Sequence, residues 1–365
     1  MPKKLDYHKS VNYSQADPVK ILAQKEGLAT AANMPAGFKE VAGTRGESAY
    51  VFEMDGRWGA FVQEGLGTKS LIAQSIYKKT GESHFAAIAQ DTVACIINDL
   101  VSVGATPVVL NAYWSSSSYE WLADAKLAED FIKGWRAACD ASKVTWGGGE
   151  TQSLPGVVSP GALEFAGSAF GVIKDSRHLV QGKNLQAGDA IVLIESSGPH
   201  ANGISLIRQI AAGLPEGYQT KLADGTTLGE AALAPTHLYA ALVAALQSAD
   251  LNVHYLSNIT GHGWRKLMRA EQPFCYVMTE TPPVHEIFNF IAEQANNSEE
   301  EMYGNYNMGA GYAVYLPAEQ AEQVVEIAKG LGLQAWVAGR VEDGPKQVVI
   351  KPKNITFAGD SLGVR

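Results

Sequence analysis

Short glycine-bearing segments recur along this chain, each placed directly after a stretch that is typical of a β-strand. The clearest are residues 64–69 (EGLGTK), 146–151 (WGGGET) and 196–203 (SSGPHANG). Because glycine has no Cβ, such segments reach positive φ angles and let a ligand approach main-chain N–H groups closely. Strand, small-residue loop and helix N-terminus is an arrangement that binds phosphate. The pattern therefore predicts alternating strands and helices whose loops carry phosphate chemistry.

The length of 365 residues exceeds the size at which one hydrophobic core usually stops growing, so we expect two domains. The segment 175–189 is polar and rich in turn formers, which suggests the boundary. We divide the chain into an arm or lid (1–45), an N-terminal domain (46–175), a C-terminal domain (176–350) and a tail (351–365). The expected fold class is α+β.

Apolar periodicity and turn signals predict the individual elements. Asn202 is the candidate N-cap of the helix that follows the third glycine segment. Strands are expected at 58–63, 106–114, 143–146, 163–173, 190–195, 274–279, 311–316 and 334–341, and helices at 18–25, 83–103, 125–141, 203–213, 282–294 and 318–330.

The bulk composition excludes several classes of function. A net charge of −9 argues against a nucleic-acid binder. The N-terminus lacks the apolar core of a signal peptide, and no apolar run is long enough to span a bilayer. The three cysteines, Cys95, Cys139 and Cys275, are far apart and form no CxxC pair, so buried thiols are favoured over zinc or dithiol chemistry. A cytoplasmic location fits these features.

Carboxylates beside the glycine segments are the candidate metal ligands. Glu64, Asp99 and Glu150 are the residues we place around Mg²⁺, which prefers carboxylate and phosphate oxygens. Asp91 and Asn98 lie on the same expected helix as Asp99. Asp91 and Asp99 are about 12 Å apart along a straight helix, so they cannot both bind one ion. The alternatives are a solvated surface turn for Glu64 and a helix-capping cluster for Asn98.

Lys69 and His200 are the candidate catalytic side chains. Lys69 follows the first glycine segment, and His200 lies within the third. A lysine offers positive charge to phosphate, whereas a histidine can act as acid, base or hydrogen-bond donor. Glycines also surround His262 in 259–264 (ITGHGW) and recur in 307–311 (NMGAG). Neither a Walker A loop nor a GxGxxG motif is present.

The order of these segments resembles the phosphoribosylformylglycinamidine cyclo-ligase (aminoimidazole ribonucleotide synthetase) family. The resemblance extends from about residue 7 to residue 349. The matching pieces are EGLGTK (64–69), DxVAxxxNDL (91–100), GGET (148–151), SSGPHANG (196–203), LAPT (233–236), ITGHG (259–263) and MYxxYNxGxG (302–311). The chain departs from the family where Glu64 replaces an aspartate, where His262 interrupts a glycine run and where the lid is reduced to 35–38. These departures indicate a divergent branch.

The resemblance implies an ATP-dependent enzyme of purine synthesis. In this family ATP phosphorylates the formyl oxygen of formylglycinamidine ribonucleotide, and ring closure releases phosphate and gives aminoimidazole ribonucleotide. It also implies ATP and Mg²⁺ as cofactors, and a homodimer in which the two N-terminal sheets form a barrel. The C-terminal α/β domain would have ferredoxin-like strand–helix–strand elements. We expect neither a nucleic-acid nor a membrane partner.

The resemblance and the loop chemistry together give each candidate residue a role. Lys69 and His200 are catalytic, and Glu64, Asp99 and Glu150 bind the metal. The nucleotide is expected at Gly65, Gly67, Thr68, Lys69, Asp91, Asn98, Gly148, Gly149 and Thr151, and the substrate at Ser197, Gly198, His200, Asn202, Thr260 and Gly261.

Two other functions stay open. One is a kinase-like member of the same superfamily, such as a thiamine-monophosphate kinase. A selenophosphate synthetase is disfavoured because it needs a reactive cysteine or selenocysteine in an N-terminal loop, and none precedes Cys95. The other is a non-catalytic paralogue that binds nucleotide, which the reduced lid and Glu64 would favour.

Overall fold

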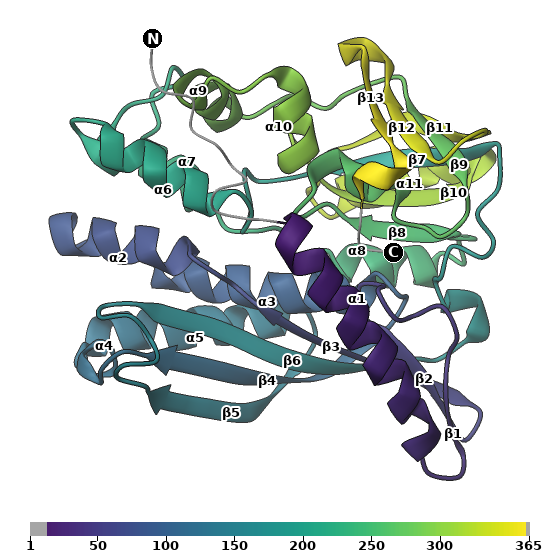
Figure 1. Cartoon of the computed structure of the whole chain (residues 1–365), viewed down its shortest axis with the longest axis horizontal. Helices are drawn as coiled ribbons and strands as arrows, with labels where there is room; N and C mark the ends of the chain where they lie inside the picture. Colours follow the sequence, from purple (N-terminus) through teal and green to yellow (C-terminus); the bar gives the residue numbers. More distant parts are fainter. Residues whose placement is uncertain (1–12, 363–365) are drawn as a thin grey trace.

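Two β-sheets, each with its own helices, build the protein (Figure 1). The computed structural model describes residues 13–362. The first sheet belongs to the N-terminal half. In their order across the sheet, its strands are β1 (Phe38–Glu40), β2 (Tyr50–Met54), β3 (Arg57–Gly65), β6 (Leu163–Ile173), β4 (Thr106–Ser116) and β5 (Thr145–Ser153). Neighbours are antiparallel except the parallel pair β4 and β5.

The helices of the N-terminal half pack on one face of this sheet. They are α2 (Lys69–Thr80), α3 (Phe85–Val101), α4 (Glu120–Ala123) and α5 (Ala125–Ala141). α5 begins and ends where its amphipathic pattern predicts. Asp124 caps its N-terminus by accepting hydrogen bonds from the main-chain N–H groups of Lys126 and Leu127. Its apolar stripe packs Phe131 and Trp135 against Trp114 of β4.

The second sheet belongs to the C-terminal half. In spatial order its strands are β13 (Ile355–Ala358), β12 (Gln347–Ile350), β9 (Phe274–Met278), β11 (Ala335–Asp343), β7 (Asp189–Glu195), β10 (Ala310–Pro317) and β8 (Tyr255–Asn258). Only β9 and β12 pair in parallel. β7 and β10 are buried along almost their whole length, as their continuous apolar sequences predict.

Several helices cover this second sheet and extend beside it. The α-helices are α6 (Ile204–Gly213), α7 (Leu228–Ala232), α8 (Ala240–Ser248), α9 (Glu286–Ala295), α10 (Glu299–Asn305) and α11 (Ala321–Gly330). The 3₁₀ helices of this half are η3 (Ser176–His178), η4 (Gly217–Gln219), η5 (Gly263–Met268), η6 (Ala318–Gln320), η7 (Lys351–Lys353) and η8 (Gly359–Ser361).

Helix α3 lies between the two halves of the protein. It packs on β3, β4 and β6 of the first sheet and on α8 of the second half. Most of its side chains are buried, including the polar residues Asp91, Thr92 and Asn98. A helix that is buried on several sides needs partners for its polar groups. The Thr92 hydroxyl donates to the carbonyl oxygen of Ile88 within the helix. The partners of Asp91 and Asn98 come from the C-terminal half, and they bring the two halves together beside the candidate site.

The triple glycine is not a loop, in contrast to the prediction. Residues 147–149 lie inside β5, the edge strand of the first sheet. Gly147 is an extra residue in the pairing with β4, because Leu110 pairs with Trp146 and Asn111 pairs with Gly148. A Cβ on Gly149 would lie 2.2 Å from the carbonyl oxygen of Ala112. These glycines therefore allow a bulged strand to approach its neighbour closely.

Two further expectations about the chain's organisation are wrong. Residues 355–358 form β13, so the segment assigned to a tail contributes an edge strand to the second sheet. Gly203, not Asn202, is the N-cap of α6, and it has a φ of 70° and no side-chain capping bond. A Cβ on Gly203 would lie 2.0 Å from the ring of Tyr306, so only glycine fits this turn.

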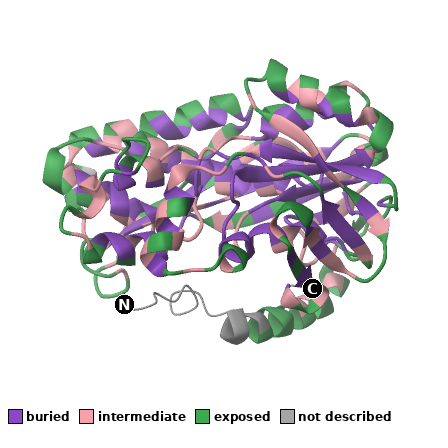
Figure 2. Ribbon diagram, turned by 90° about the horizontal axis from the view of Figure 1, so that it is seen from above, coloured by how far each residue is buried: buried purple, intermediate pink, exposed green. Residues whose placement is uncertain are grey.

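The N-terminal arm consists of α1 (Tyr13–Ala29) and η2 (Thr30–Asn33), and then joins the first sheet through β1. α1 is mostly exposed over its described side chains, and Figure 2 shows it along the outside of the molecule. Residues 1–12 of the expected arm lie outside the described part. Among residues 13–362, none of the helices has the length and apolar character needed to cross a membrane.

Candidate functional site

A cavity of about 300 Å³ lies between the two halves and gathers several of the candidate residues. Of the residues predicted to bind metal, nucleotide or substrate, it is lined by Glu64, Gly65, Asp99, Asn202, Thr260 and Gly261. The other residues around it are Lys20, Glu47, Ser48, Leu66, Cys95, Ala201, Asn258, His262, Lys266 and Arg269. The cavity thus draws on α1, the end of β3, α3, the loop before α6 and the segment around η5.

Three carboxylates from the N-terminal half line this cavity, namely Glu47, Glu64 and Asp99, and the last two were predicted. Glu64 lies near the end of β3, and Asp99 lies on the side of α3 that also carries Cys95. Burial, together with the nearby negative charge of Asp99, raises the pKa of Glu64 to about 7. Asp99 is held in place by Asn258, whose Nδ2 donates to Asp99 Oδ1 at 2.7 Å. A pair of repelling carboxylates is a site where a bound cation is stabilising.

Two basic residues face the same cavity, Lys266 on η5 and Arg269 directly after it, and sequence reasoning missed both. Arg269 Nη1 donates to Ser48 Oγ at 3.0 Å, and its Nη2 donates to the carbonyl oxygen of Gly46 at 2.8 Å. Burial lowers the pKa of Lys266 to about 7, with the charge of Arg269 acting in the same direction. The available signal was their position, since Lys266 and Arg269 follow the ITGHG segment by three and six residues.

The ITGHG segment forms a strained turn at the cavity wall. His262 has a φ of 72° and the following Gly263 a φ of 52°, so the chain reverses sharply before η5. A Cβ on Gly263 would lie 2.3 Å from the carbonyl oxygen of Tyr303, which explains the glycine at this position. Burial lowers the pKa of His262 to about 3, with Lys266 and Arg265 adding repulsion. His262 is therefore neutral near pH 7, and Thr260 and Gly261 are presented to the cavity.

Lys69 and Asp91 do not face the cavity, in contrast to the prediction that they bind nucleotide. They form an ion pair of 2.8 Å in which both side chains are fully buried. Lys69 Nζ also donates to the carbonyl oxygen of Ala234 at 2.9 Å. Asp91 Oδ1 accepts from both the main-chain N–H and the hydroxyl of Thr236. The pair therefore binds residues 234 and 236 to the N-terminal half, and neither side chain contacts solvent.

Asn98 has the same structural role and does not line the cavity, and its assignment to the nucleotide stays a prediction. Its Nδ2 donates to the carbonyl oxygen of His237 at 2.9 Å, and its Oδ1 accepts from the N–H of Tyr239 at 2.9 Å. One buried amide thus satisfies two main-chain groups that lie about 140 residues away in sequence. Asp91 and Asn98 together fix the segment 233–239, here called the LAPT segment, along α3.

His200 is buried rather than open to substrate. Its Nε2 accepts a hydrogen bond from the N–H of Ser197 at 3.2 Å. Burial holds the pKa of His200 well below its ordinary value, and His237 adds to the effect. Ser197 Oγ donates to the carbonyl oxygen of Pro235, and the carbonyl oxygen of Gly198 accepts from Asn307 Nδ2. The 196–203 loop is therefore tied down internally, and its residues 201 and 202 reach the cavity.

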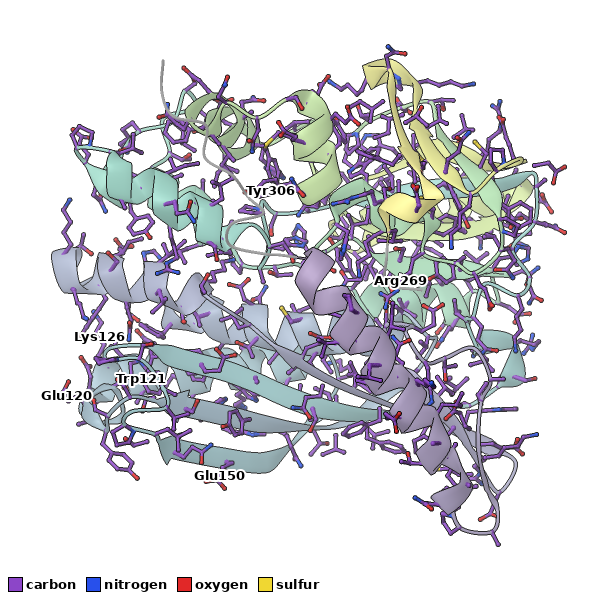
Figure 3. The ribbon with its side chains drawn as sticks, viewed as in Figure 1. Glu120, Trp121, Lys126, Glu150, Arg269 and Tyr306 are labelled. Carbon is purple, nitrogen blue, oxygen red and sulfur yellow. The ribbon has the colours of Figure 1, made fainter. Side chains whose placement is uncertain are left out.

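The GGET residues lie away from this cavity within one chain. Gly148, Gly149, Glu150 and Thr151 are exposed on β5, which β6 and β4 separate from β3, the strand of Glu64, and Asp99 lies on α3. Figure 3 shows Glu150 at the outer edge of the first sheet and Arg269 between the two halves. Of the first glycine segment, Gly67 is exposed, and Thr68 Oγ1 lies 3.4 Å from Ser205 Oγ of α6.

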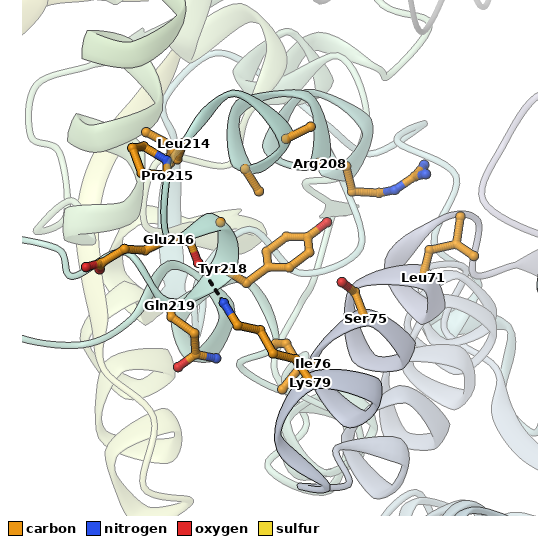
Figure 4. Close-up of a pocket in the computed structure, with 13 residues that line it drawn as sticks. Leu71, Ser75, Ile76, Lys79, Arg208, Leu214, Pro215, Glu216, Tyr218 and Gln219 are labelled. Carbon is orange, nitrogen blue, oxygen red and sulfur yellow. Dashed lines mark hydrogen bonds between the residues drawn. The ribbon is translucent and has the colours of Figure 1, made fainter.

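A larger hollow of about 480 Å³ lies elsewhere, between α2 and the segment from α6 to η4 (Figure 4). Lys79, Arg208 and Tyr218 line it, and Lys79 Nζ donates to the carbonyl oxygen of Glu216 at 3.4 Å. Its one carboxylate, that of Glu216, is exposed. The smaller cavity gathers the charged side chains of both halves, and it is therefore the better candidate for phosphate chemistry.

Comparison with known proteins agrees with this organisation. Residues 46–173 match the family model "AIR synthase related protein, N-terminal domain", and residues 186–351 match the corresponding C-terminal domain. A phosphoribosylformylglycinamidine cyclo-ligase of Methanococcus maripaludis is 32% identical over 300 residues, which cover 82% of each chain. One from Methanobrevibacter smithii is 31% identical over 328 residues, which cover 89% of this chain and 91% of the relative.

A solved structure of similar fold is that of a HypE–HypF complex, with a TM-score of 0.60 at 18% identity. The match covers 92% of this chain and 98% of that one. At this identity the likeness concerns the fold alone. The two family domains and the relatives above 30% identity go further: the chain belongs to the AIR synthase related family, among the phosphoribosylformylglycinamidine cyclo-ligases.

Proposed function

We propose that the chain catalyses the ATP-dependent cyclisation of formylglycinamidine ribonucleotide to aminoimidazole ribonucleotide, at the cavity between its two halves. The observation that carries the proposal is the meeting of Glu64 and Asp99 with Asn202, Thr260 and Gly261, which come from opposite halves. The family relatives bear the name of this activity. ATP as the phosphate donor is supported by a neighbour of similar fold, titled "AaThiL complexed with AMPPCP and TMP", with a TM-score of 0.59 at 15% identity.

The chemistry needs positioning and charge neutralisation more than a covalent nucleophile. The formyl oxygen is a poor leaving group until it carries a phosphoryl group. The amidine nitrogen then attacks the activated carbon, the ring closes and phosphate leaves. In such a transfer the protein contributes cations, main-chain N–H groups and a site that excludes water. The turn at 260–262 and the basic side chains of Lys266 and Arg269 supply these at the cavity wall.

The residues present fit a magnesium ion. Among residues 13–362 no cluster of three or more Asp, Glu, His or Cys side chains forms a closed metal cage. Mg²⁺ does not require one, since it is held by one or two carboxylates together with substrate phosphates and water. Glu64 and Asp99 repel one another in the free site and would hold the ion. When bound, the ion neutralises charge on the phosphate oxygens.

We further propose that the protein acts as a homodimer through the uncovered face of its first sheet. α2, α3 and α5 pack on the opposite face. The uncovered face carries Phe61 in register with Phe170, and Phe52 lies 6.4 Å from Phe170. An apolar aromatic cluster on an uncovered sheet is typical of an interface. In the second domain, the order β11-β7-β10-β8 with α8 and α11 as crossovers supports the ferredoxin-like arrangement.

The dimer would also give the GGET residues a role. Gly148, Gly149, Glu150 and Thr151 lie on the edge strand beside the uncovered face, so we propose that they reach the nucleotide from a partner subunit. On this view one site draws on Glu64 and Asp99 of one chain and Glu150 of the other.

The activity is tested directly with purified protein, Mg²⁺, ATP and formylglycinamidine ribonucleotide, by following ADP and the imidazole product. Wild type should form both in equal amounts, and Glu64→Gln should lower kcat at least about 100-fold with unchanged circular dichroism. Glu53→Gln on β2, outside the cavity, is the control and should retain full turnover. Wild-type protein that binds nucleotide but forms neither product would contradict the proposal and leave the kinase-like and non-catalytic alternatives.

Subunit mixing tests the shared site. Glu64→Gln and Glu150→Gln homodimers should each be nearly inactive. When the two are unfolded, mixed and refolded together, half of the dimers are mixed and each holds one intact site, so about a quarter of wild-type turnover should return. Recovery that stays at the level of the single variants would place Glu150 outside the partner's site.

A further inference from the structure

The side-chain nitrogen of Lys266 has no ion-pair partner among the described residues. Its side chain lines the cavity, and no described carboxylate oxygen lies within 4.0 Å of its Nζ. Lys69 behaves differently, because its Nζ lies 2.8 Å from Asp91 and its side chain is fully enclosed, whereas Lys266 is half-buried. Asp99, Glu64 and Glu47 act on Lys266 only from beyond contact distance. Burying a cation without a paired anion costs free energy, which a ligand can restore.

The backbone around Lys266 is held in place by several interactions. The carbonyl oxygen of Lys266 accepts from Ser257 Oγ at 2.9 Å. On one side Trp264 is fully buried, and its Nε1 donates to the carbonyl oxygen of Asn307 at 2.8 Å. Beside it Arg265 donates to the carbonyl oxygens of Gly304 and Ser361. The ammonium is therefore presented from a fixed turn, and binding a ligand needs little reorganisation.

The charges around Lys266 favour an anion that approaches from the open cavity. Arg269 is held by hydrogen bonds to Ser48 and Gly46 and by an ion pair with Glu47 at 3.8 Å, so its charge is already compensated and Lys266 is the cation at this wall that a ligand can pair with. Glu64 and Asp99 face the cavity from the opposite half. An anion seated between them would meet a lysine on one side and a carboxylate-bound cation on the other. Phosphate suits this setting, because lysine binds it as a point charge.

We propose that Lys266 Nζ binds a phosphate oxygen of the ligand and so positions it for the transfer. This inference deepens the proposed function and rests on it. The phosphate could be the terminal one of the nucleotide or the 5′-phosphate of the ribonucleotide, and the chemistry is the same for both. Asn202 and Thr260 lie around the same cavity as further hydrogen-bonding side chains.

Calorimetric titration with matched ligands tests the contact. Wild type, Lys266→Met and Lys266→Gln are each titrated with Mg²⁺–AMPPCP, with Mg²⁺–ADP, with formylglycinamidine ribonucleotide and with its dephosphorylated nucleoside. Loss of one charged hydrogen bond should raise the dissociation constant of the ligand whose phosphate Lys266 contacts roughly 10- to 100-fold. The matched ligand without that phosphate, ADP for AMPPCP or the nucleoside for the ribonucleotide, should bind wild type and variants with equal affinity. Lys133→Met on α5, an exposed lysine, is the control and should match wild type throughout.

The pair of ligands that shows the loss identifies the source of the phosphate. A loss confined to AMPPCP assigns Lys266 to the nucleotide, and a loss confined to the ribonucleotide assigns it to the 5′-phosphate. Equal weakening of full and truncated ligands, or no weakening of either, overturns the inference. Wild type that binds these ligands without forming product would contradict the proposed function, while the comparison of full and truncated ligands would still decide the role of Lys266.

Discussion

Gly104 shows how one residue fixes the turn between α3 and β4. It has a φ of 83°, and a Cβ there would lie 1.6 Å from the carbonyl oxygen of His178. Because the obstacle is main chain rather than a flexible side chain, the turn must move to admit any other residue. The N-terminal domain is thereby packed closely against the start of the second half.

Gly104→Ala should lower the free energy of unfolding by about 3 kcal/mol or more, since backbone displacement adds to the positive-φ cost. Gly81→Ala is the matched control: it has a φ of 75° at the C-cap of α2 and nothing within 4 Å of the added Cβ. That variant should lose only about 1 to 2 kcal/mol. Urea unfolding measures both, and equal losses would show that the close approach to His178 is unimportant.

His262 gives a pH dependence with a definite sign. Its folded pKa is lowered from the ordinary 6.5 to about 3, so the folded chain stays neutral in acid while the unfolded chain takes up a proton. Stability from this residue is complete above pH 6.5 and is lost as pH falls toward 3. Between pH 7.5 and 5.5 the loss should be about 1.4 kcal/mol.

His262→Asn tests this, because asparagine tolerates the positive φ of that position. The variant's unfolding free energy, measured by urea at pH 7.5 and 5.5, should fall by about 1.4 kcal/mol less than that of wild type. His178→Asn on η3 controls for the general effect of replacing a histidine. If the unfolding free energy of His262→Asn falls by as much as that of wild type between these two pH values, His262 takes up a proton in the folded chain.

At the scale of elements, α3 organises the molecule. Its apolar periodicity predicted the helix, and the structure has it from Phe85 to Val101. The partners of Asp91 and Asn98 were not predictable, because they lie 139 to 145 residues further along the chain. Asp91 and Asn98 were expected to meet nucleotide, and in the structure they bind the main chain of the LAPT segment. Of the three residues Asp91, Asn98 and Asp99, Asp99 is the one that lines the cavity, together with Cys95 of the same helix.

Asn98→Ala should therefore act on stability. It removes two hydrogen bonds and leaves a buried carbonyl and a buried N–H of the LAPT segment unsatisfied, so unfolding should become about 2 to 4 kcal/mol easier. Gln90→Ala is the control on the same helix, because Gln90 is half-buried and makes one bond, to the carbonyl oxygen of Thr236. Its cost should stay near 1 kcal/mol. Denaturant unfolding of both variants compares them, and similar costs would argue against the role of α3 in fixing this segment.

At the scale of the whole molecule, the exposed aromatic face of the first sheet points to assembly. Phe61→Arg places a charge at the centre of the proposed interface and should convert the dimer to a 39.0 kDa monomer in light-scattering chromatography. Leu331→Arg is the control, since Leu331 is 44% exposed and Phe61 is 45% exposed. The control should remain dimeric. A Phe61→Arg dimer, or a monomeric wild type, would contradict this interface.

The amino-acid sequence by itself determined the elements and the family. The order of glycine segments, the amphipathic patterns of α3 and α5 and the apolar strands β7 and β10 are local, so they can be read along the chain. The same holds for Glu64 and Asp99, whose carboxylates stand beside recognisable segments.

Only the tertiary structure decided which polar residues face a ligand. The triple glycine became a bulged strand because β5 must approach β4, and Lys69 became an internal ion pair because Asp91 and Ala234 enclose it. Lys266 and Arg269 joined the site because η5 turns back toward α3. Burial and partner choice depend on contacts between distant segments, and residue type and spacing carry no record of those contacts.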